Sequence, residues 1–234
     1  VNAMHACLLK VPWSGSGKGL NWCLHGFTKP VSNWCERVLR EQGGLTAEPI
    51  YNKVKDFALE FYSDGQGEVR FAGYSVFSTN EHGAYTGNLL ASDGQIEESI
   101  ACCLSLEKLT GIREALRAEL ASIYGNTYTG YLGVDMMVCR SDKENGYRVH
   151  PCVEINMRMN MGVVARLFYD RFVAPGSKGC FAVEYVPDNE TLRARHEQDM
   201  HDYPLTVEQG RLASGYLPLV PVTGKSCYRA YVRI

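Results

Sequence analysis

Long hydrophobic runs are missing from this 234-residue sequence: none approaches the roughly 18 apolar residues that cross a membrane, so no membrane partner is expected. Positive charge is not in excess either, because 24 Lys and Arg residues stand against 26 Asp and Glu residues. A nucleic-acid-binding surface usually needs a basic excess, so nucleic acid is not expected as a partner. Internal repeats are also missing, and a content of 45% hydrophobic residues is typical of a globular protein.

The nine cysteines include no Cys-x-x-Cys pair, the close spacing that zinc ligands usually have. Their number is odd, and several lie within apolar stretches, as reduced core thiols do. No signal peptide is evident in the sequence. These features predict free thiols, no zinc site and a cytoplasmic protein.

Segments with strand and helix patterns alternate along the chain. Short apolar or alternating runs predict strands at 5–11, 45–51, 55–62, 68–77, 131–139, 147–156, 180–186, 216–220 and 227–233. Apolar residues at helical spacing predict helices at 32–42, 96–103, 109–123 and 161–172, and a polar helix is expected at 190–200. The fold class predicted from this order is α+β with mainly antiparallel sheets.

A glycine- and serine-rich loop follows the first predicted strand. Such loops let backbone N–H groups close on phosphate oxygens. A Walker A loop is excluded, because Pro12 stands where its first glycine belongs and Gly19 where its Ser or Thr belongs. The protein-kinase loop is excluded because its third glycine would come one residue later. A flexible surface loop is the alternative, but Lys10 in the preceding apolar strand favours phosphate, since a buried lysine needs an anion.

A second group of polar residues lies in two apolar strands that a polar turn joins. Residues 133–138 read Gly-Val-Asp-Met-Met-Val, and residues 153–158 read Val-Glu-Ile-Asn-Met-Arg. Residues two apart on a strand share a face, so Glu154, Asn156 and Arg158 project together.

Folded symmetrically about its turn, this hairpin pairs Ser141 with Arg148 and therefore Asp135 with Glu154, whose Cβ atoms then lie roughly 5 Å apart. Two facing carboxylates destabilise a sheet unless a proton or a cation lies between them. With the amide oxygen of Asn156 they provide the oxygen ligands that magnesium prefers. We therefore predict a magnesium site; solvated surface charge is the alternative, and it explains acidic positions in Val/Met/Ile-rich strands poorly.

A strand lysine with a glycine loop, followed much later by Gly-Val-Asp and Glu-x-Asn-x-Arg, resembles the ATP-grasp superfamily, which includes D-alanine–D-alanine ligase, biotin carboxylase and other carboxylate–amine ligases. The resemblance covers about residues 4–172. It implies an ATP-grasp fold in which two α+β subdomains with mainly antiparallel sheets grip the nucleotide between them. Residues 4–52 would form the small lid subdomain and residues 53–186 the core subdomain with the metal-binding hairpin, on which residues 187–234 would pack as an extension.

The resemblance also implies roles for individual residues. Lys10, which would contact the nucleotide phosphates, and Arg158, which would meet the transferred phosphoryl group or the acylphosphate, are the expected catalytic residues. The residues expected to close over the phosphates are Ser14, Gly15, Ser16, Gly17 and Lys18. Those expected near adenine and ribose are Glu48, Ile50, Tyr51 and Asp56. The expected ligands of magnesium, or of manganese in its place, are Asp135, Glu154 and Asn156.

The function that this resemblance implies is an ATP- and Mg²⁺-dependent ligase. A substrate carboxylate attacks the γ-phosphate of ATP to give an acylphosphate, and an amine or a thiol then displaces phosphate. Two alternatives stay open: a catalytically inactive nucleotide-binding module of a larger protein, and a small-molecule kinase on the same fold. The expected partners are ATP and an unidentified small carboxylate. A domain that family members usually carry before the lysine strand is missing from this sequence, so a missing N-terminal domain or a partner chain is also expected.

Overall fold

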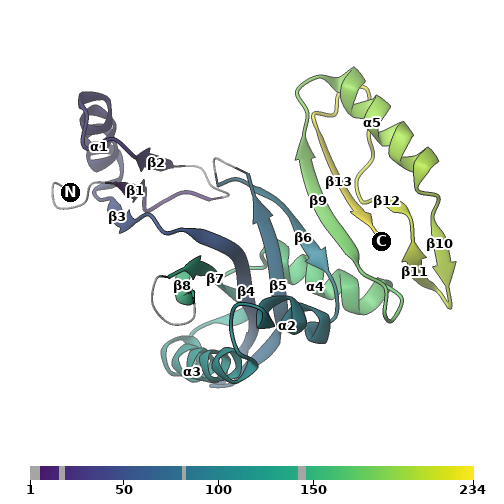
Figure 1. Cartoon of the computed structure of the whole chain (residues 1–234), viewed down its shortest axis with the longest axis horizontal. Coiled ribbons are helices and arrows are strands. Elements are labelled where there is room, and N and C mark those ends of the chain that lie inside the picture. The colour runs from purple at the N-terminus through teal and green to yellow at the C-terminus, as the bar shows by residue number, and fades with distance from the viewer. Residues whose placement is uncertain (1–5, 16–18, 81–82, 142–145) are drawn as a thin grey trace. The chain divides into compact units, whose positions relative to one another are not determined.

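The computed structural model describes residues 6–15, 19–80, 83–141 and 146–234, which form two compact units (Figure 1). Unit 1 comprises Val1–Asn52 together with Thr79–Tyr85. Unit 2 comprises Lys53–Ser78 together with Thr86–Ile234. None of the helices in the described parts of the chain is long and apolar enough to cross a membrane.

Unit 1 contains a three-stranded antiparallel sheet and one helix. Its strands lie in the order β2 (Leu20–Cys23), β1 (Cys7–Lys10) and β3 (Thr46–Pro49), and its helix is α1 (Lys29–Gln42). Proline in the first turn begins α1, and Gly43 in the left-handed region ends it. The small core of the unit consists largely of buried cysteines, with Cys7, Cys23 and Cys35 packed around Leu9.

Unit 2 is organised around an eight-stranded sheet. The strand order is β12-β13-β9-β6-β5-β4-β7-β8, and the described pairings within it are antiparallel. The strands are β4 (Lys53–Asp64), β5 (Val69–Thr79), β6 (Tyr85–Leu90), β7 (Thr129–Arg140), β8 (Tyr147–Asn156), β9 (Gly179–Tyr185), β12 (Tyr216–Pro218) and β13 (Tyr228–Arg233). A separate two-stranded sheet pairs β10 (Thr206–Glu208) with β11 (Arg211–Ser214). The helices are α2 (Asp93–Ala101), α3 (Leu106–Tyr124), α4 (Met161–Phe172) and α5 (Asn189–Asp202).

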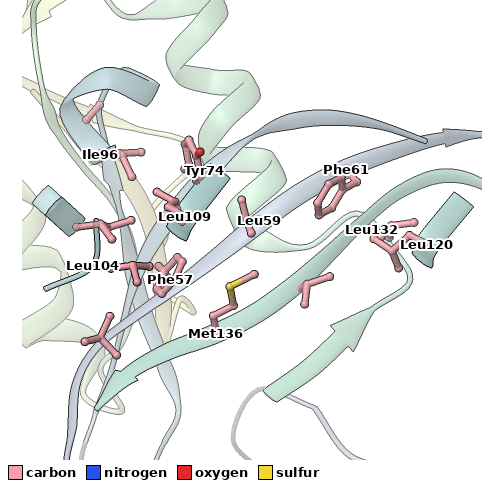
Figure 2. Close-up of a cluster of buried hydrophobic side chains, with 14 of the residues drawn as sticks. Phe57, Leu59, Phe61, Tyr74, Ile96, Leu104, Leu109, Leu120, Leu132 and Met136 are labelled. Carbon is pink, nitrogen blue, oxygen red and sulfur yellow. The ribbon is translucent and has the colours of Figure 1, made fainter. Parts of the chain in front are cut away.

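One face of strands β4 and β7 forms the main hydrophobic core, shown in Figure 2. Successive residues of a strand point to opposite faces, so Phe57, Leu59 and Phe61 of β4 all enter this core. They meet Leu132, Val134 and Met136 of β7 and the apolar residues of α2 and α3. Burying each of these large side chains stabilises the fold by roughly 1.5–3 kcal/mol.

The opposite face of the same two strands is polar. It carries Asp56 and Glu60 on β4, and Gly133 and Asp135 on β7. The N-terminal end of α4 packs against part of this face, because a Cβ atom added to Gly162 would lie 2.1 Å from Glu60 Oε1. The alternation of β4 and β7 therefore separates the hydrophobic core from a face that is rich in carboxylates.

The predicted α+β class with mainly antiparallel sheets is confirmed. The predicted helix at 161–172 is α4, with the same bounds. Strands β2, β6, β10 and β11 were not predicted; each has only three to six residues, and a short segment shows alternation only weakly. Ile123, the last apolar residue of the helix predicted at 109–123, lies within α3 but is 59% exposed and does not face the core.

The chain passes from unit 1 to unit 2 between Asn52 and Lys53. Residues 187–234, expected to pack on the core subdomain as an extension, belong to unit 2, where β12 and β13 continue the sheet beyond β9. The three-part division into residues 4–52, 53–186 and 187–234 stays a prediction.

The core packing predicts a contrast within strand β4. Phe57 is fully buried, whereas Val54 is 40% exposed. We expect Phe57→Ala to lower the free energy of unfolding of unit 2 by about 3–5 kcal/mol, because it leaves a cavity between the sheet and its helices. Val54→Ala, the control, should change it by less than about 1 kcal/mol. Urea denaturation of both variants measures the difference, and similar losses in both would contradict this account of the core.

Candidate functional site

The structure brings four of the predicted site residues together on the polar face of unit 2. Asp135 of β7 lies directly opposite Glu154 of β8, and Gly133 lies opposite Asn156. The Asn156 amide donates a hydrogen bond to Asp135 Oδ2 at 3.0 Å. The Arg158 guanidinium donates to Asn156 Oδ1 at 3.1 Å, so one hydrogen-bonded chain joins Arg158, Asn156 and Asp135.

The register near the turn differs from the symmetric pairing expected from the sequence. Cys139, not Ser141, lies opposite Arg148, so the predicted Ser141–Arg148 pair is wrong. The pairing is irregular between Asp135 and Met137. From His150 to Glu154 the chain advances four residues on β8, but the paired segment of β7 advances only two, which brings Asp135 opposite Glu154. The extra residues include a proline, which lacks the N–H group for a regular ladder and is tolerated in an edge strand or at a bulge. The expected carboxylate pair therefore forms through a bulge.

Burial and the facing Glu154 carboxylate raise the pKa of Asp135. The pKa of the Asp135 carboxyl is raised to about 7, mainly by burial and then by the negative charge of Glu154, while the hydrogen bond from Asn156 opposes the rise. Asp56 adds to this pKa rise and Arg158 opposes it. The Asp135 carboxyl therefore loses its proton less readily than an exposed carboxyl does, unless a cation compensates its negative charge.

The donor set fits a hard divalent cation. Asp135 and Glu154 offer carboxylate oxygens, and Asn156 offers an amide oxygen whose contact with Arg158 would have to be exchanged. In the described part of the chain, no three His, Cys, Asp or Glu side chains form a group that could hold a metal ion. A magnesium ion here would therefore take its remaining ligands from water and substrate phosphate, as magnesium commonly does.

Asp56 lies on the same face as Asp135, one position along the neighbouring strand. It stands opposite Met137, while Asp135 stands opposite Ala58. Its carboxylate forms an ion pair with Lys53 of the same strand. The resemblance assigns Asp56 to the ribose, and the structure places it beside the carboxylate pair, where its charge reaches Asp135.

Glu60 is a polar residue of this face that the sequence analysis missed. Its side chain is only 1% exposed and accepts a hydrogen bond from Asn160 at 2.9 Å. The pKa of Glu60 is raised to about 8, mainly by burial, with a smaller rise from the charge of Asp135, while the hydrogen bond from Asn160 opposes both. The signal was present in the sequence, because an acidic residue lies between Leu59 and Phe61 within an alternating apolar strand.

In unit 1, Lys10 forms an ion pair with Glu48 at 2.6 Å, across strands β1 and β3. An anion does accompany this strand lysine, as expected, but it is a carboxylate of the same unit. The partial burial of Lys10 therefore does not by itself point to a phosphate.

The glycine loop connects β1 to β2, which pair as an antiparallel hairpin. The Val11 N–H group donates to the Gly19 carbonyl at 3.1 Å, and Gly19 has a φ of 75°, a conformation that favours glycine. Ser14 and Gly15 are exposed, while Ser16, Gly17 and Lys18 lie outside the described residues. The remaining predicted nucleotide contacts of unit 1 lie in the segment after β3, where Ile50 and Tyr51 are half-buried.

Comparison with known proteins gives a fold-level answer. No protein-family model matches the sequence, and no curated protein matches it significantly. Among solved structures, the chain is similar to the biotin carboxylase domain of 2-oxoglutarate carboxylase from Hydrogenobacter thermophilus, with a TM-score of 0.54, 12% identity and coverage of 98% of this chain and 53% of that one. It is also similar to N5-carboxyaminoimidazole synthetase from Staphylococcus aureus, with a TM-score of 0.54, 12% identity and coverage of 97% and 57%.

A third similar structure is carboxyaminoimidazole ribonucleotide synthase from Aspergillus clavatus, with a TM-score of 0.55, 13% identity and coverage of 98% of this chain and 58% of that one. These neighbours are ATP-grasp enzymes, and the likeness shows that this chain has the ATP-grasp fold, as the motifs predicted. The three structures are complexes with MgADP, ADP and bicarbonate, with ADP, and with ATP, respectively. The chain spans slightly more than half the length of each.

The buried carboxyl of Glu60 predicts how stability depends on pH. Its folded pKa of about 8 lies above the ordinary 4.5, so the folded protein keeps a proton that the unfolded chain releases. The resulting stabilisation is complete below pH 4.5 and is lost as pH rises through about 8, by at most about 1.4 kcal/mol per pH unit. We expect Glu60→Gln to flatten this decline without abolishing it, because Asp135 contributes in the same direction.

Urea unfolding between pH 5 and pH 9 measures this dependence. Glu119→Gln, which changes an exposed carboxylate on α3, is the matched control and should leave the slope unchanged. Parallel pH profiles for the wild-type protein and Glu60→Gln would show that the Glu60 carboxyl is already ionised when folded.

Proposed function

We propose that this chain is the ATP-grasp part of an ATP- and Mg²⁺-dependent ligase that activates a carboxylate as an acylphosphate for attack by an amine or a thiol. The observation that carries the proposal is the Asp135–Glu154 carboxylate pair, with Asn156 and Arg158 hydrogen-bonded beside it. Complexes of ATP-grasp neighbours with MgADP and ATP support the choice of nucleotide and metal.

In this proposal Asp135, Glu154 and Asn156 hold the metal, and manganese could replace magnesium. The metal supplies charge neutralisation for the nucleotide phosphates. Arg158 is exposed and lies next to this donor set, so its guanidinium can donate to an oxygen of the phosphoryl group in transfer. Positioning and charge stabilisation are the protein's main contributions to phosphoryl transfer, and no side-chain nucleophile is required.

The unit 1 residues, together with Asp56 of unit 2, would take the nucleotide roles implied by the resemblance. Lys10 would exchange its ion pair with Glu48 for a contact with the phosphates. The loop that would close over the phosphates contains Ser14, Gly15, Ser16, Gly17 and Lys18. The residues that would receive adenine and ribose are Glu48, Ile50, Tyr51 and Asp56. Residues 4–52 would act as the lid subdomain, and residues 53–186 as the core subdomain.

The substrate is proposed to be a small carboxylate. Bicarbonate in one neighbouring structure supports a compact acceptor of this kind. Because the chain spans little more than half of its neighbours, further parts of the active site would come from an N-terminal domain or a partner chain.

A nucleotide-binding module without catalysis is the second candidate. The Lys10–Glu48 ion pair favours it, since a lysine that is already neutralised has less to gain from a phosphate. Release of ADP in the presence of a carboxylate and an amine would exclude this module, and ADP release without a new amide or thioester would indicate a kinase.

The metal assignment predicts that nucleotide binding depends on the carboxylate pair. Calorimetric titration with a non-hydrolysable ATP analogue should show binding with magnesium and little or none with EDTA. Glu154→Gln should weaken the magnesium-dependent binding at least about tenfold, because it removes one of two charged ligands, and should abolish ATP turnover in a catalytically competent protein. Glu119→Gln is the control. Equal magnesium-dependent affinity for the analogue in both variants would contradict the metal assignment.

The role of Lys10 predicts a separate effect on nucleotide affinity. Lys10→Met should weaken binding of the analogue by about tenfold to a hundredfold, the value of a charge-assisted hydrogen bond, while dependence on magnesium persists. Lys29→Met, on the exposed start of α1, is the control. Calorimetry under the same conditions tests it; undiminished affinity in Lys10→Met would leave this lysine as a structural partner of Glu48.

A further inference from the structure

A row of three residues crosses the polar face next to the candidate metal site. Glu60 on β4 stands opposite Gly133 on β7, and Gly133 stands opposite Asn156 on β8. Asn156, a proposed metal ligand, is also the last residue of β8. Beyond it the chain leaves the sheet, and four residues later Asn160 caps helix α4.

The segment 156–160 forms a loop that returns over the same row. A Cβ atom added to Gly133 would lie 2.2 Å from Asn160 Nδ2 and 2.4 Å from Glu60 Oε2. Asn160 therefore occupies the space above Gly133 that a side chain would fill, and it reaches Glu60 there. The loop begins and ends at one three-residue row of the sheet.

Asn160 is held in this place from both ends of its side chain. Its amide group donates to Glu60 Oε2 at 2.9 Å, and its Oδ1 accepts from the Val163 N–H group at 2.9 Å. Asn160 is 8% exposed and Glu60 is 1% exposed, so an amide donor left without its acceptor would be costly here. The bond to Glu60 thus ties the first turn of α4 to the sheet.

Close packing leaves the Glu60 carboxyl little freedom. A Cβ atom added to Gly162 would lie 2.1 Å from Glu60 Oε1 and 2.5 Å from Ser75 Oγ. Farther along α4, Arg166 donates to Asp93, the first residue of α2, at 3.0 Å, and its side chain packs over Gly73 of β5, so this part of the helix is held independently of Glu60. Loss of the Glu60 contact should therefore loosen the loop and the helix start without detaching the helix.

Arg158 lies at the middle of this loop, between the two anchored residues. Its N–H group donates to the Asn156 carbonyl at 2.9 Å, which closes a tight turn, and its side chain donates to Asn156 Oδ1. Arg158 itself is exposed, so its side chain extends from a backbone position that the anchors at Asn156 and Asn160 fix.

We propose that Glu60 is a positioning residue: through its hydrogen bond with Asn160 it fixes loop 156–160, and so places Arg158 and the Asn156 amide for the bound phosphate and metal. This inference rests on the proposed function for its consequence in nucleotide binding. The fixing of the loop itself is a property of the protein alone. Glu60 touches neither nucleotide nor metal in this proposal and acts only through Asn160.

The experiment combines hydrogen exchange of the protein alone with calorimetry of the magnesium–ATP analogue complex. Glu60→Met removes the acceptor at similar volume, and Glu60→Gln keeps it. Asn160→Ser retains a good cap for α4 but is too short to reach Glu60. Val134→Ala, adjacent to Gly133 but facing the core, is the control for lost stability.

In Glu60→Met and Asn160→Ser, amide exchange at residues 158–163 should become at least about fivefold faster, and affinity for the analogue should fall about tenfold. Glu60→Gln should keep both values within about twofold of the wild-type protein. Val134→Ala, compared with the other variants under conditions that match their global stability, should leave both values unchanged. If Glu60→Met fails to fold, Asn160→Ser decides the outcome.

Unchanged exchange at residues 158–163 in Asn160→Ser would overturn the proposal, as would equally fast exchange there in Val134→Ala. Normal analogue affinity in a variant with a loosened loop would also overturn it. If the wild-type protein binds no analogue, the proposed function fails, and the exchange result still tells whether Glu60 fixes the loop.

Discussion

The alternation of strands β4 and β7 is the constraint on which unit 2 depends. On one face Phe57, Leu59 and Phe61 close the core with α2 and α3; on the other, Glu60 and Asp135 gather with the polar end of β8. A shift of one residue in this pairing would move the carboxylates into the core and the aromatic rings to the surface. Burial of the apolar face therefore fixes the register, and the register in turn fixes which carboxylates meet.

The sequence predicted this much because periodicity is a local property. Apart from the short strands β6, β10 and β11, the strands and most helices of unit 2 follow from alternation and helical spacing, and Glu154 and Asn156 share a face by the same rule. Partners across strands are not local. The pairing of Asp135 with Glu154 was predicted by a symmetric hairpin, yet it forms through a bulge after a different pairing at Arg148. The predicted Asp135–Glu154 pair is therefore present, although the Ser141–Arg148 pair from which it was derived is not.

Lys10 and Glu60 show the other limit of sequence reasoning. Both are ionisable residues in apolar strands, and each needs a partner when buried. The sequence indicates the need but not the partner: Lys10 finds Glu48 on a neighbouring strand, and Glu60 finds Asn160, one hundred positions away, at the start of a helix. Sequence analysis selected Lys10 because the glycine loop follows it and missed Glu60 because no motif surrounds it.

The burial of Glu60 also bears on the charge of the candidate site. If Glu60 were ionised, its charge would join those of Asp56, Asp135 and Glu154 on one face, and each would disfavour the others. With the Glu60 pKa raised to about 8, this carboxyl keeps its proton near neutral pH and accepts the Asn160 hydrogen bond as a neutral group. The other carboxyls of this face belong to Asp56, Asp135 and Glu154, and the last two are the proposed metal ligands. In the proposed arrangement, a single buried side chain thus holds the loop that carries Arg158 and adds little negative charge to the proposed cation site.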